Sequence, residues 1–292
     1  MKVELTALSA RHPAARAQSR PAVDGIDLLI GAGESVAVIG PSGAGKTTLL
    51  HAMACALTPS SGSLRLDDVA PWSLPRAQLQ RVRARLFLAP QVPPLPPRQR
   101  VVTAVLAGQL PAMGLWRSVR SLVYPVDIPA AHDALDRFDL ADKLFERVDR
   151  LSGGERQRVG LARALVAMGG GGGPAGGRAA PPGASVLLID EPLSALDPTR
   201  ARQAIGALVD GARDHGATLV ATLHQVDVAL AHFPRIVGLR DGRLAFDLPA
   251  AAVTRERLAA LYDRFEHGLR GEVPALAADT PAAPAPVLMH CR

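Results

Sequence analysis

Residues 40–48 have the types and the spacing of a loop that wraps around phosphate groups. They follow the pattern G-x-x-x-x-G-K-T and are Gly40, Pro41, Ser42, Gly43, Ala44, Gly45, Lys46, Thr47 and Thr48. Gly43 and Gly45 allow the backbone angles that turn successive N–H groups toward an anion. Lys46 places a positive charge beside the β- and γ-phosphates of a nucleotide, and the Thr47 hydroxyl can ligate Mg²⁺. The stretch therefore predicts a site for a nucleoside triphosphate and Mg²⁺.

A pair of carboxylates, Asp190 and Glu191, follows an apolar run over residues 186–189. In open parallel sheets, ligands bind at the carboxyl ends of the strands, so the pair is expected to face the phosphate loop. Asp190 would then face the Mg²⁺ held by Thr47, and Glu191 would face the γ-phosphate and its attacking water as a general base. A pair of solvated loop acids is the alternative, but it does not explain the four apolar residues directly before them.

Gln91 and His224 come directly or almost directly after runs that are expected to form strands, 86–89 and 218–223. A lone histidine is more often a hydrogen-bonded core residue than a catalytic one. The position of His224, at the same predicted sheet edge as Asp190, favours a functional role. The other seven of the eight histidines have no such placement.

A second candidate anion site begins at Ser152, Gly153 and Gly154, which open a helix expected to run to about residue 168. Ser152 is the expected N-cap, and exposed N–H groups at a helix N-terminus attract anions. One chain rarely needs two such sites for one triphosphate. We therefore expect the second site to serve the nucleotide of a neighbouring molecule.

The elements that must position these groups alternate between buried strands and helices. Residues 35–39, directly before the phosphate loop, form a short apolar run typical of a buried parallel strand. Residues 48–57 are expected to form a helix whose N-terminus adds partial positive charge at the phosphates, with Cys55 on its inner face. A strand before the loop and a helix after it argue against a chance glycine-rich turn.

A helical subdomain is expected over residues 92–150, inserted into an α/β core. Four prolines between residues 93 and 97 exclude regular structure there, and helical spacing of apolar residues follows from residue 101. A second helix of this subdomain is expected over 129–138. Gly160, inside the helix that follows the subdomain, indicates close packing at that position, because glycine costs about 1 kcal/mol there against alanine.

The composition of the 292-residue chain limits the kinds of core, partner and cysteine chemistry that it can have. Hydrophobic residues make up 48% and aromatic residues 3%, so the core must be built mainly from Ala, Leu and Val. The formal net charge of +6 permits anionic partners, but no basic patch interleaves with aromatic residues, so no nucleic acid is expected as a partner. The two cysteines, Cys55 and Cys291, lie far apart and offer no disulfide framework or zinc pattern.

The sequence also indicates how the protein relates to a membrane. No stretch approaches the roughly 18 apolar residues of a spanning helix, and the N-terminus lacks a signal-peptide pattern. We therefore expect a cytosolic protein whose role at a membrane needs a partner chain.

Residues 151–155, Leu-Ser-Gly-Gly-Glu, resemble the signature sequence of ATP-binding-cassette (ABC) proteins. The order of the motifs along residues 3–250 is also similar to that family. The resemblance implies a head-to-tail dimer with two ATP molecules at its interface, each between Lys46 of one chain and residues 152–154 of the other. It further implies that Gln91 contacts Mg²⁺ or water, that Asp197 touches the opposite chain, and that His224 holds the γ-phosphate.

The same resemblance implies an α/β fold: a P-loop NTPase with a RecA-like parallel-sheet core, an antiparallel β subdomain and an inserted helical subdomain. The ABC ATPase domain is expected over residues 1–270, with its core formed by 1–91 and 151–250. Residues 169–183, rich in Gly, Pro and Ala, are expected to form a flexible loop, and 271–292 a disordered tail.

A finer resemblance is to the ATPase subunits of phosphonate importers. Residues 116–118, 223–227 and 235–243 are similar to that group. Three departures stand out: His12 occupies the place of the usual adenine-stacking aromatic, residues 169–183 are longer than the usual link, and Glu155-Arg156 replaces a frequent Gln-Gln.

These observations together predict an ATP-hydrolysing, energy-coupling subunit of an ABC importer, for phosphonates or a related oxyanion. Its expected partners are a second copy, transmembrane permease subunits and, through them, a solute-binding protein, and its expected place is the cytoplasmic face of the inner membrane. Three alternatives stay open: an importer for another small solute, a soluble ABC ATPase acting on DNA or ribosomes, and a nucleotide-binding regulator without turnover.

Overall fold

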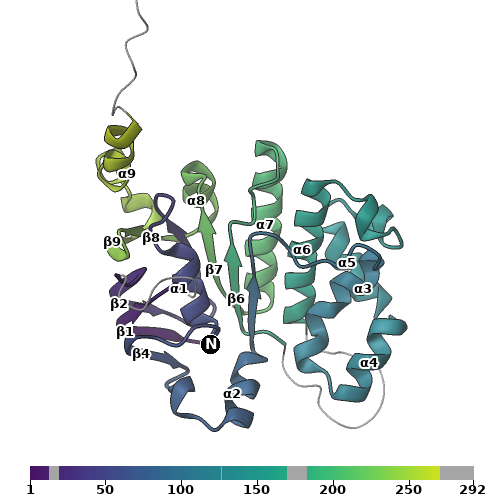
Figure 1. Ribbon diagram of the computed structural model, residues 1–292. Coiled ribbons are helices and arrows are strands. Elements are labelled where there is room, and N and C mark those ends of the chain that lie inside the picture. Colours follow the sequence, from purple (N-terminus) through teal and green to yellow (C-terminus); the bar gives the residue numbers. More distant parts are fainter. Residues whose placement is uncertain (13–19, 126, 170–182, 270–292) are drawn as a thin grey trace, which may run out of the picture.

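The computed structural model describes residues 1–12, 20–125, 127–169 and 183–269. Most of the Gly-rich stretch expected to be a flexible loop, and the expected C-terminal tail, lie outside these ranges. Two sheets organise the described part: a three-stranded sheet in the order β2-β1-β4 and a six-stranded sheet in the order β5-β6-β7-β3-β8-β9. Figure 1 shows the small sheet on one side of the molecule and a group of helices on the other.

The six-stranded sheet is parallel except for its last pair, β8 and β9. Its strands are β3 (Ser35–Ile39), β5 (Leu86–Ala89), β6 (Val186–Asp190), β7 (Thr218–Leu223), β8 (Arg235–Arg240) and β9 (Arg243–Pro249). Every residue of β3, β6 and β7 is buried, which explains why these strands are mainly apolar. The predicted strands over 35–39, 86–89 and 218–223 are confirmed to the residue.

The small sheet is antiparallel and consists of β1 (Val3–Ala10), β2 (Val23–Ile30) and β4 (Ser61–Leu66). Its inner side chains share one apolar cluster with the near face of the large sheet and with helix α1 (Lys46–Met53). This layer therefore holds α1, and with it the end of the phosphate loop, from one side.

Helix α1 differs from the prediction of a helix over 48–57 at both ends. It begins at Lys46 because Gly45, at φ 100°, is its N-cap. It ends at Met53, and Cys55 lies beyond it in the left-handed region at φ 53°. Cys55 is fully buried as expected, but in the turn after the helix rather than on its inner face. Burial raises the pKa of its thiol to about 11.

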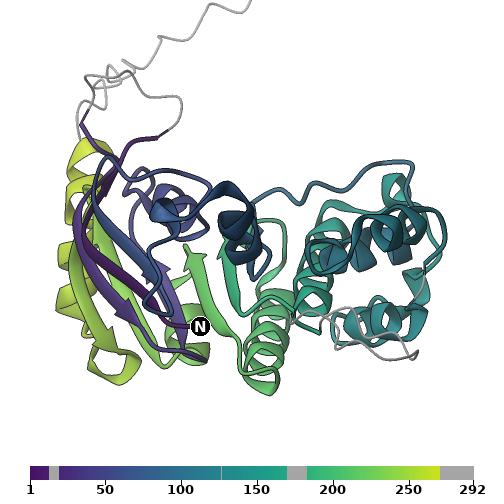
Figure 2. The same cartoon turned by 90° about the horizontal axis from the view of Figure 1, so that it is seen from below.

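The helical part follows β5 in the chain and gathers around α6 (Gly153–Met168) (Figures 1 and 2). It contains α3 (Val101–Leu106), α4 (Leu115–Val123) and α5 (Ile128–Asp136). The expected helix at 129–138 begins one residue earlier, because the Asp127 side chain caps it by accepting from the N–H of Ala130 at 3.3 Å. Apolar residues of α3, α5 and α6 join those of β6 and β7 in one continuous core. The boundaries of the predicted subdomain over 92–150 stay a prediction.

The other helices each pack against a strand of the large sheet. They are α2 (Arg76–Arg83), α7 (Pro198–Asp214), α8 (Val226–His232) and α9 (Arg255–Leu269). Short 3₁₀ turns occur at Pro71–Ser73, Ala107–Ala112, Ala141–Lys143, Val148–Arg150 and Ala250–Ala252. In the part of the chain that the structure covers, no helix has the length and apolar character to cross a membrane.

Helix α6 begins at a capping box. Ser152 is the N-cap, as predicted, and its hydroxyl accepts from the N–H of Glu155 at 3.2 Å. The Glu155 carboxylate in turn accepts from the N–H of Ser152 at 2.7 Å. Both bonds satisfy N–H groups that a helix N-terminus leaves without partners.

This capping box predicts a pH dependence of stability. The hydrogen bonds from Ser152 hold the pKa of Glu155 below its ordinary value of 4.5. A lowered folded-state pKa contributes stability above the unfolded pKa, and this contribution is lost as pH falls through the folded value. Because glutamine keeps the capping geometry, Glu155→Gln isolates the charge. Urea unfolding of the two proteins between about pH 6 and pH 3 should show the advantage of the wild type, less than about 1 kcal/mol, vanishing toward the acid end. An advantage that stays constant over this range would contradict the assignment.

Candidate functional site

The strand register brings the candidate residues to one edge of the large sheet. Strands β3, β6 and β7 are parallel neighbours, with Ile39 paired to Leu223 and Asp190 paired to Thr222. The three strands therefore end side by side at the same edge of the sheet. The chain continues from β3 into the phosphate loop, from β6 into Glu191 and from β7 into His224. This is the edge at which parallel sheets bind ligands.

The phosphate loop needs glycines because of its backbone angles and because segments distant in sequence approach it closely. Gly40, Gly43 and Gly45 have φ values of 153°, 79° and 100°. A Cβ at Gly45 would lie 2.2 Å from the carbonyl oxygen of Ala22, and one at Gly40 would lie 2.0 Å from that of Leu239. The sequence pattern identified Gly43 and Gly45 as the residues with special backbone angles. The equally strict requirement at Gly40 arises from β8, which is distant in the chain.

Lys46 is folded over the loop. The residue is 5% exposed, and Nζ donates to the carbonyl oxygens of Gly40 at 2.9 Å and Pro41 at 3.1 Å. Burial lowers the pKa of its ammonium group, while the charges of Glu191 and Asp190 act in the opposite direction. The structure thus places a desolvated cation between the loop carbonyls and two carboxylates, where an anion gains most from it.

Asp190 is held by hydroxyl groups on both of its oxygens. Thr47 Oγ1 donates to Oδ2 at 2.8 Å, and Thr222 Oγ1 donates to Oδ1 at 2.6 Å. A hydroxyl and a carboxylate next to a phosphate loop are the hard oxygen ligands that Mg²⁺ takes together with phosphate and water. Among the described residues, no cluster of three or more His, Cys, Asp or Glu forms a protein-only metal cage. These residues therefore fit a magnesium ion bound jointly with a nucleotide.

Glu191 contacts two of the other candidate residues, Gln91 and His224. Gln91 Nε2 donates to its Oε2 at 2.8 Å, and His224 Nε2 lies 2.5 Å from its Oε1. Its backbone has a φ of 46°, a left-handed conformation that is uncommon for a residue with a Cβ. Three residues predicted separately from sequence are thus brought into direct contact.

A cleft joins these groups to the phosphate loop. Its volume is about 650 Å³, within the range of small-molecule sites. It is lined by His12, Ala22, Ser42, Gly43, Ala44, Gly45, Lys46, Thr47, Thr48, Gln91, Glu191 and His224. His12, at the position where the resemblance expects an adenine-stacking aromatic, thus lies on the wall of the cleft.

Residues 152–154 and Asp197 do not line this cleft. They form a second group: a Cβ at Gly154 would lie 3.0 Å from the carbonyl oxygen of Ala195, and Asp197 caps α7 by accepting from the N–H of Arg200 at 3.0 Å. Ser152 and Gly153 are exposed. The structure therefore separates the two predicted anion sites within one chain.

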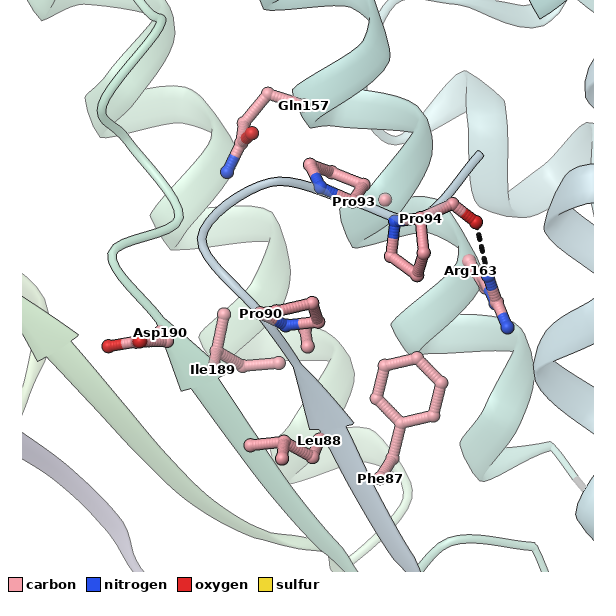
Figure 3. A pocket seen from close by; sticks show the side chains of 11 residues that line it. Phe87, Leu88, Pro90, Pro93, Pro94, Gln157, Arg163, Ile189 and Asp190 are labelled. Carbon is pink, nitrogen blue, oxygen red and sulfur yellow. Dashed lines mark hydrogen bonds between the residues drawn. The ribbon is translucent and has the colours of Figure 1, made fainter. Parts of the chain in front are cut away.

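Helix α6 also holds the loop that follows Gln91. Figure 3 shows Pro93 and Pro94 lying over α6, beside a pocket that reaches Asp190 and Ile189. A Cβ at residue 160 would lie 2.7 Å from Cγ of Pro93, so the close packing expected at Gly160 is present. Arg163 Nη1 donates to the carbonyl oxygen of Pro94 at 3.4 Å.

Sequence reasoning missed Thr222. It is fully buried near the end of β7 and contacts both carboxylate residues, because Glu191 N–H donates to its Oγ1 at 2.9 Å. The signal that could have identified it is a hydroxyl side chain two residues before His224, in a strand that is otherwise mainly apolar.

Comparison with known proteins agrees with this geometry. The model of the family described as ABC transporter matches residues 23–168. The phosphonates import ATP-binding protein PhnC of Polaromonas sp. (strain JS666) is 63% identical over 100% of both chains. PhnC 2 of Pseudomonas aeruginosa (strain UCBPP-PA14), with the same descriptive name, is 52% identical over 84% of this chain and 86% of its own.

Solved structures share the fold. The dimeric structure of MJ0796, a bacterial ABC transporter cassette, has a TM-score of 0.67 at 24% identity and covers 85% of this chain and 98% of its own. cbiO1 from Clostridium perfringens has a TM-score of 0.67 at 22% identity over 91% and 98%. The α/β fold predicted from the sequence is confirmed, and the chain belongs to the ABC transporter family, as one of its ATP-binding proteins.

Proposed function

We propose that this protein is the ATP-hydrolysing, energy-coupling subunit of an ABC importer for phosphonates or a related oxyanion. The observation that carries the proposal is Glu191, held by Gln91 and His224 at the mouth of a phosphate loop. The names of relatives up to 63% identical support phosphonates as the solute class.

The chemistry assigned to this site is the transfer of the γ-phosphoryl group to water. The N–H groups of residues 42–48 and the Lys46 ammonium bind the triphosphate. The Thr47 hydroxyl and the Asp190 carboxylate, with Gln91 nearby, would hold Mg²⁺, which neutralises phosphate charge when it is bound.

Glu191 acts as the general base. It accepts a proton from water as the oxygen of that water bonds to the γ-phosphorus and the bond to the ADP oxygen breaks. His224 lies 2.5 Å from this carboxylate and can orient it, and because it also lines the cleft we expect it to contact the γ-phosphate.

A second copy completes the site in this proposal. Ser152 and Gly153 are exposed, and residues 152–154 do not line the cleft, so we expect them not to reach the nucleotide of their own chain. A head-to-tail partner would place its Ser152, Gly153 and Gly154 over the triphosphate, with its Asp197 beside them. Such a clamp would account for the two anion sites that the sequence predicts in one chain.

The permease is assigned to the helical part. Trp116 and Val119 of α4 are 86% and 52% exposed, which is unusual for large apolar side chains on one short helix. A membrane-embedded permease with an apolar groove matches this chemistry, and its solute-binding protein would act through it. The protein would then lie on the cytoplasmic face of the membrane as a peripheral subunit.

Removal of the Lys46 charge should weaken nucleotide binding. We expect Lys46→Ala to lower ATP affinity at least about tenfold, because a charge-assisted contact contributes about 1.5–3 kcal/mol. Isothermal titration calorimetry with Mg²⁺–ATP measures this. Lys143→Ala, at a surface lysine that pairs with Asp142, is the matched control and should bind like the wild type. Equal affinities in all three proteins would remove Lys46 from the site.

Loss of the general base should separate binding from turnover. Glu191→Gln should keep ATP affinity and slow phosphate release at least about a hundredfold, the lower end of general-base effects. Glu256→Gln, on the exposed surface of α9, is the control and should retain the wild-type rate. Near-normal turnover of Glu191→Gln would refute the assignment.

Glu191→Gln also provides a test, in cells, of which solute is imported. Uptake of a labelled phosphonate should disappear when the gene is deleted, return with the wild type and stay absent with Glu191→Gln. Unchanged phosphonate uptake in the deletion strain, with loss of uptake of another solute, would instead support an importer of different specificity.

The exposed tryptophan provides a test of the partner. Trp116→Ser should reduce co-purification of the permease at least about tenfold, the scale of an aromatic hot spot, while ATP turnover of the isolated protein stays unchanged. Val69→Ser, at an exposed apolar position in the turn after β4, is the control. Retention of the permease by Trp116→Ser, or co-purification of ribosomes or DNA in its place, would contradict this role of α4.

A further inference from the structure

Strand β7 carries two fully buried threonines, Thr218 and Thr222, at opposite ends. Thr218 serves the fold: its hydroxyl donates to the carbonyl oxygen of Met1 at 2.7 Å and accepts from the N–H of Gly33 at 3.0 Å. Thr222 lies at the functional edge, and its partners are Asp190 and Glu191. The strand thus contains a structural threonine and a second one whose contacts are both with site residues.

The Thr222 hydroxyl donates its one hydrogen bond to Asp190. It donates to Oδ1 at 2.6 Å, a short bond of the kind that a charged acceptor forms. Thr47 donates to the other oxygen, Oδ2, so the two bonds together fix which oxygen of the buried Asp190 carboxylate points toward the phosphate loop. Without it, Oδ1 would be buried without a partner, and the carboxylate could rotate.

The lone pair of the same hydroxyl accepts the N–H of Glu191 at 2.9 Å. Glu191 has the left-handed φ of 46°, so a bond to its N–H opposes relaxation of the backbone toward the usual region. That backbone conformation directs the Glu191 side chain to Gln91 and His224. One hydroxyl group therefore fixes both carboxylate residues.

We propose that Thr222 is a positioning residue for ATP hydrolysis, which orients Asp190 toward the metal site and Glu191 toward the attacking water. The proposal rests on the proposed ATPase function. It assigns Thr222 no contact with nucleotide, because Thr222 does not line the cleft. The expected defect is consequently in turnover and in the response to Mg²⁺, and not in ATP binding.

The test compares Thr222→Val, which keeps the shape and removes the hydroxyl, with Thr222→Ser, which keeps the hydroxyl. Thr218→Val is the matched control, since it removes an equally buried hydroxyl from the same strand at the end away from the site. For each protein we would measure kcat, KM for ATP, the Kd for ATP, the Mg²⁺ concentration for half-maximal rate, and Tm.

We expect Thr222→Val to lower kcat about tenfold and to raise the half-maximal Mg²⁺ concentration at least threefold, with the Kd for ATP within twofold. Thr222→Ser should recover at least half of the wild-type kcat. Thr218→Val should lower Tm yet keep kcat within twofold. If Thr222→Val does not fold, Thr222→Ala takes its place with the same expectations.

Three results would overturn the proposal: a kcat of Thr222→Val within twofold of wild type, an equal loss of kcat in Thr218→Val, or a defect in Thr222→Ser as large as that in Thr222→Val. An absence of ATP hydrolysis by the wild-type protein would instead refute the proposed function, and with it this inference.

Discussion

The parallel pairing of β3, β6 and β7 is the constraint on which the site depends. It brings the ends of three strands that are distant in sequence to one level, and so places Lys46, Glu191 and His224 around one cleft. All three strands are buried over their full length, so a one-residue shift of register would move every side chain to the opposite face and disrupt the packing on both faces. The positions of the polar groups follow from the packing of apolar ones.

Helix α6 connects the cleft with the predicted signature at residues 152–154. Its first turn carries Ser152 and the glycines after it, while its middle holds Pro93 and Pro94 of the loop that follows Gln91. Apolar residues of α6 belong to the same continuous core as β6. The groups predicted to contact one nucleotide and the groups predicted to contact a neighbouring one are therefore parts of one packed unit.

Much of this arrangement could be predicted from the sequence because the signals are local. Mainly apolar runs identified β3, β5 and β7, and the capping pattern at Ser152 identified the start of α6. What escaped prediction depends on distant segments. Gly40 was predicted as part of the loop, but its close approach to Leu239 was not, and Thr222 acquires its role only when β7 lies beside β6. The end of α1 at Met53 was missed because Cys55 reverses the backbone in a left-handed conformation that no local pattern marked.

The central claim is that two copies of the chain complete each nucleotide site. The most direct test is sedimentation velocity of the slowly hydrolysing Glu191→Gln protein with saturating Mg²⁺–ATP, alone and combined with Ser152→Arg, which would block the signature by size and charge. The account predicts a dimer with ATP, a monomer without it, and a monomer when Ser152→Arg is also present. A protein that stays monomeric with bound ATP, or a dimer that is indifferent to Ser152→Arg, would contradict it.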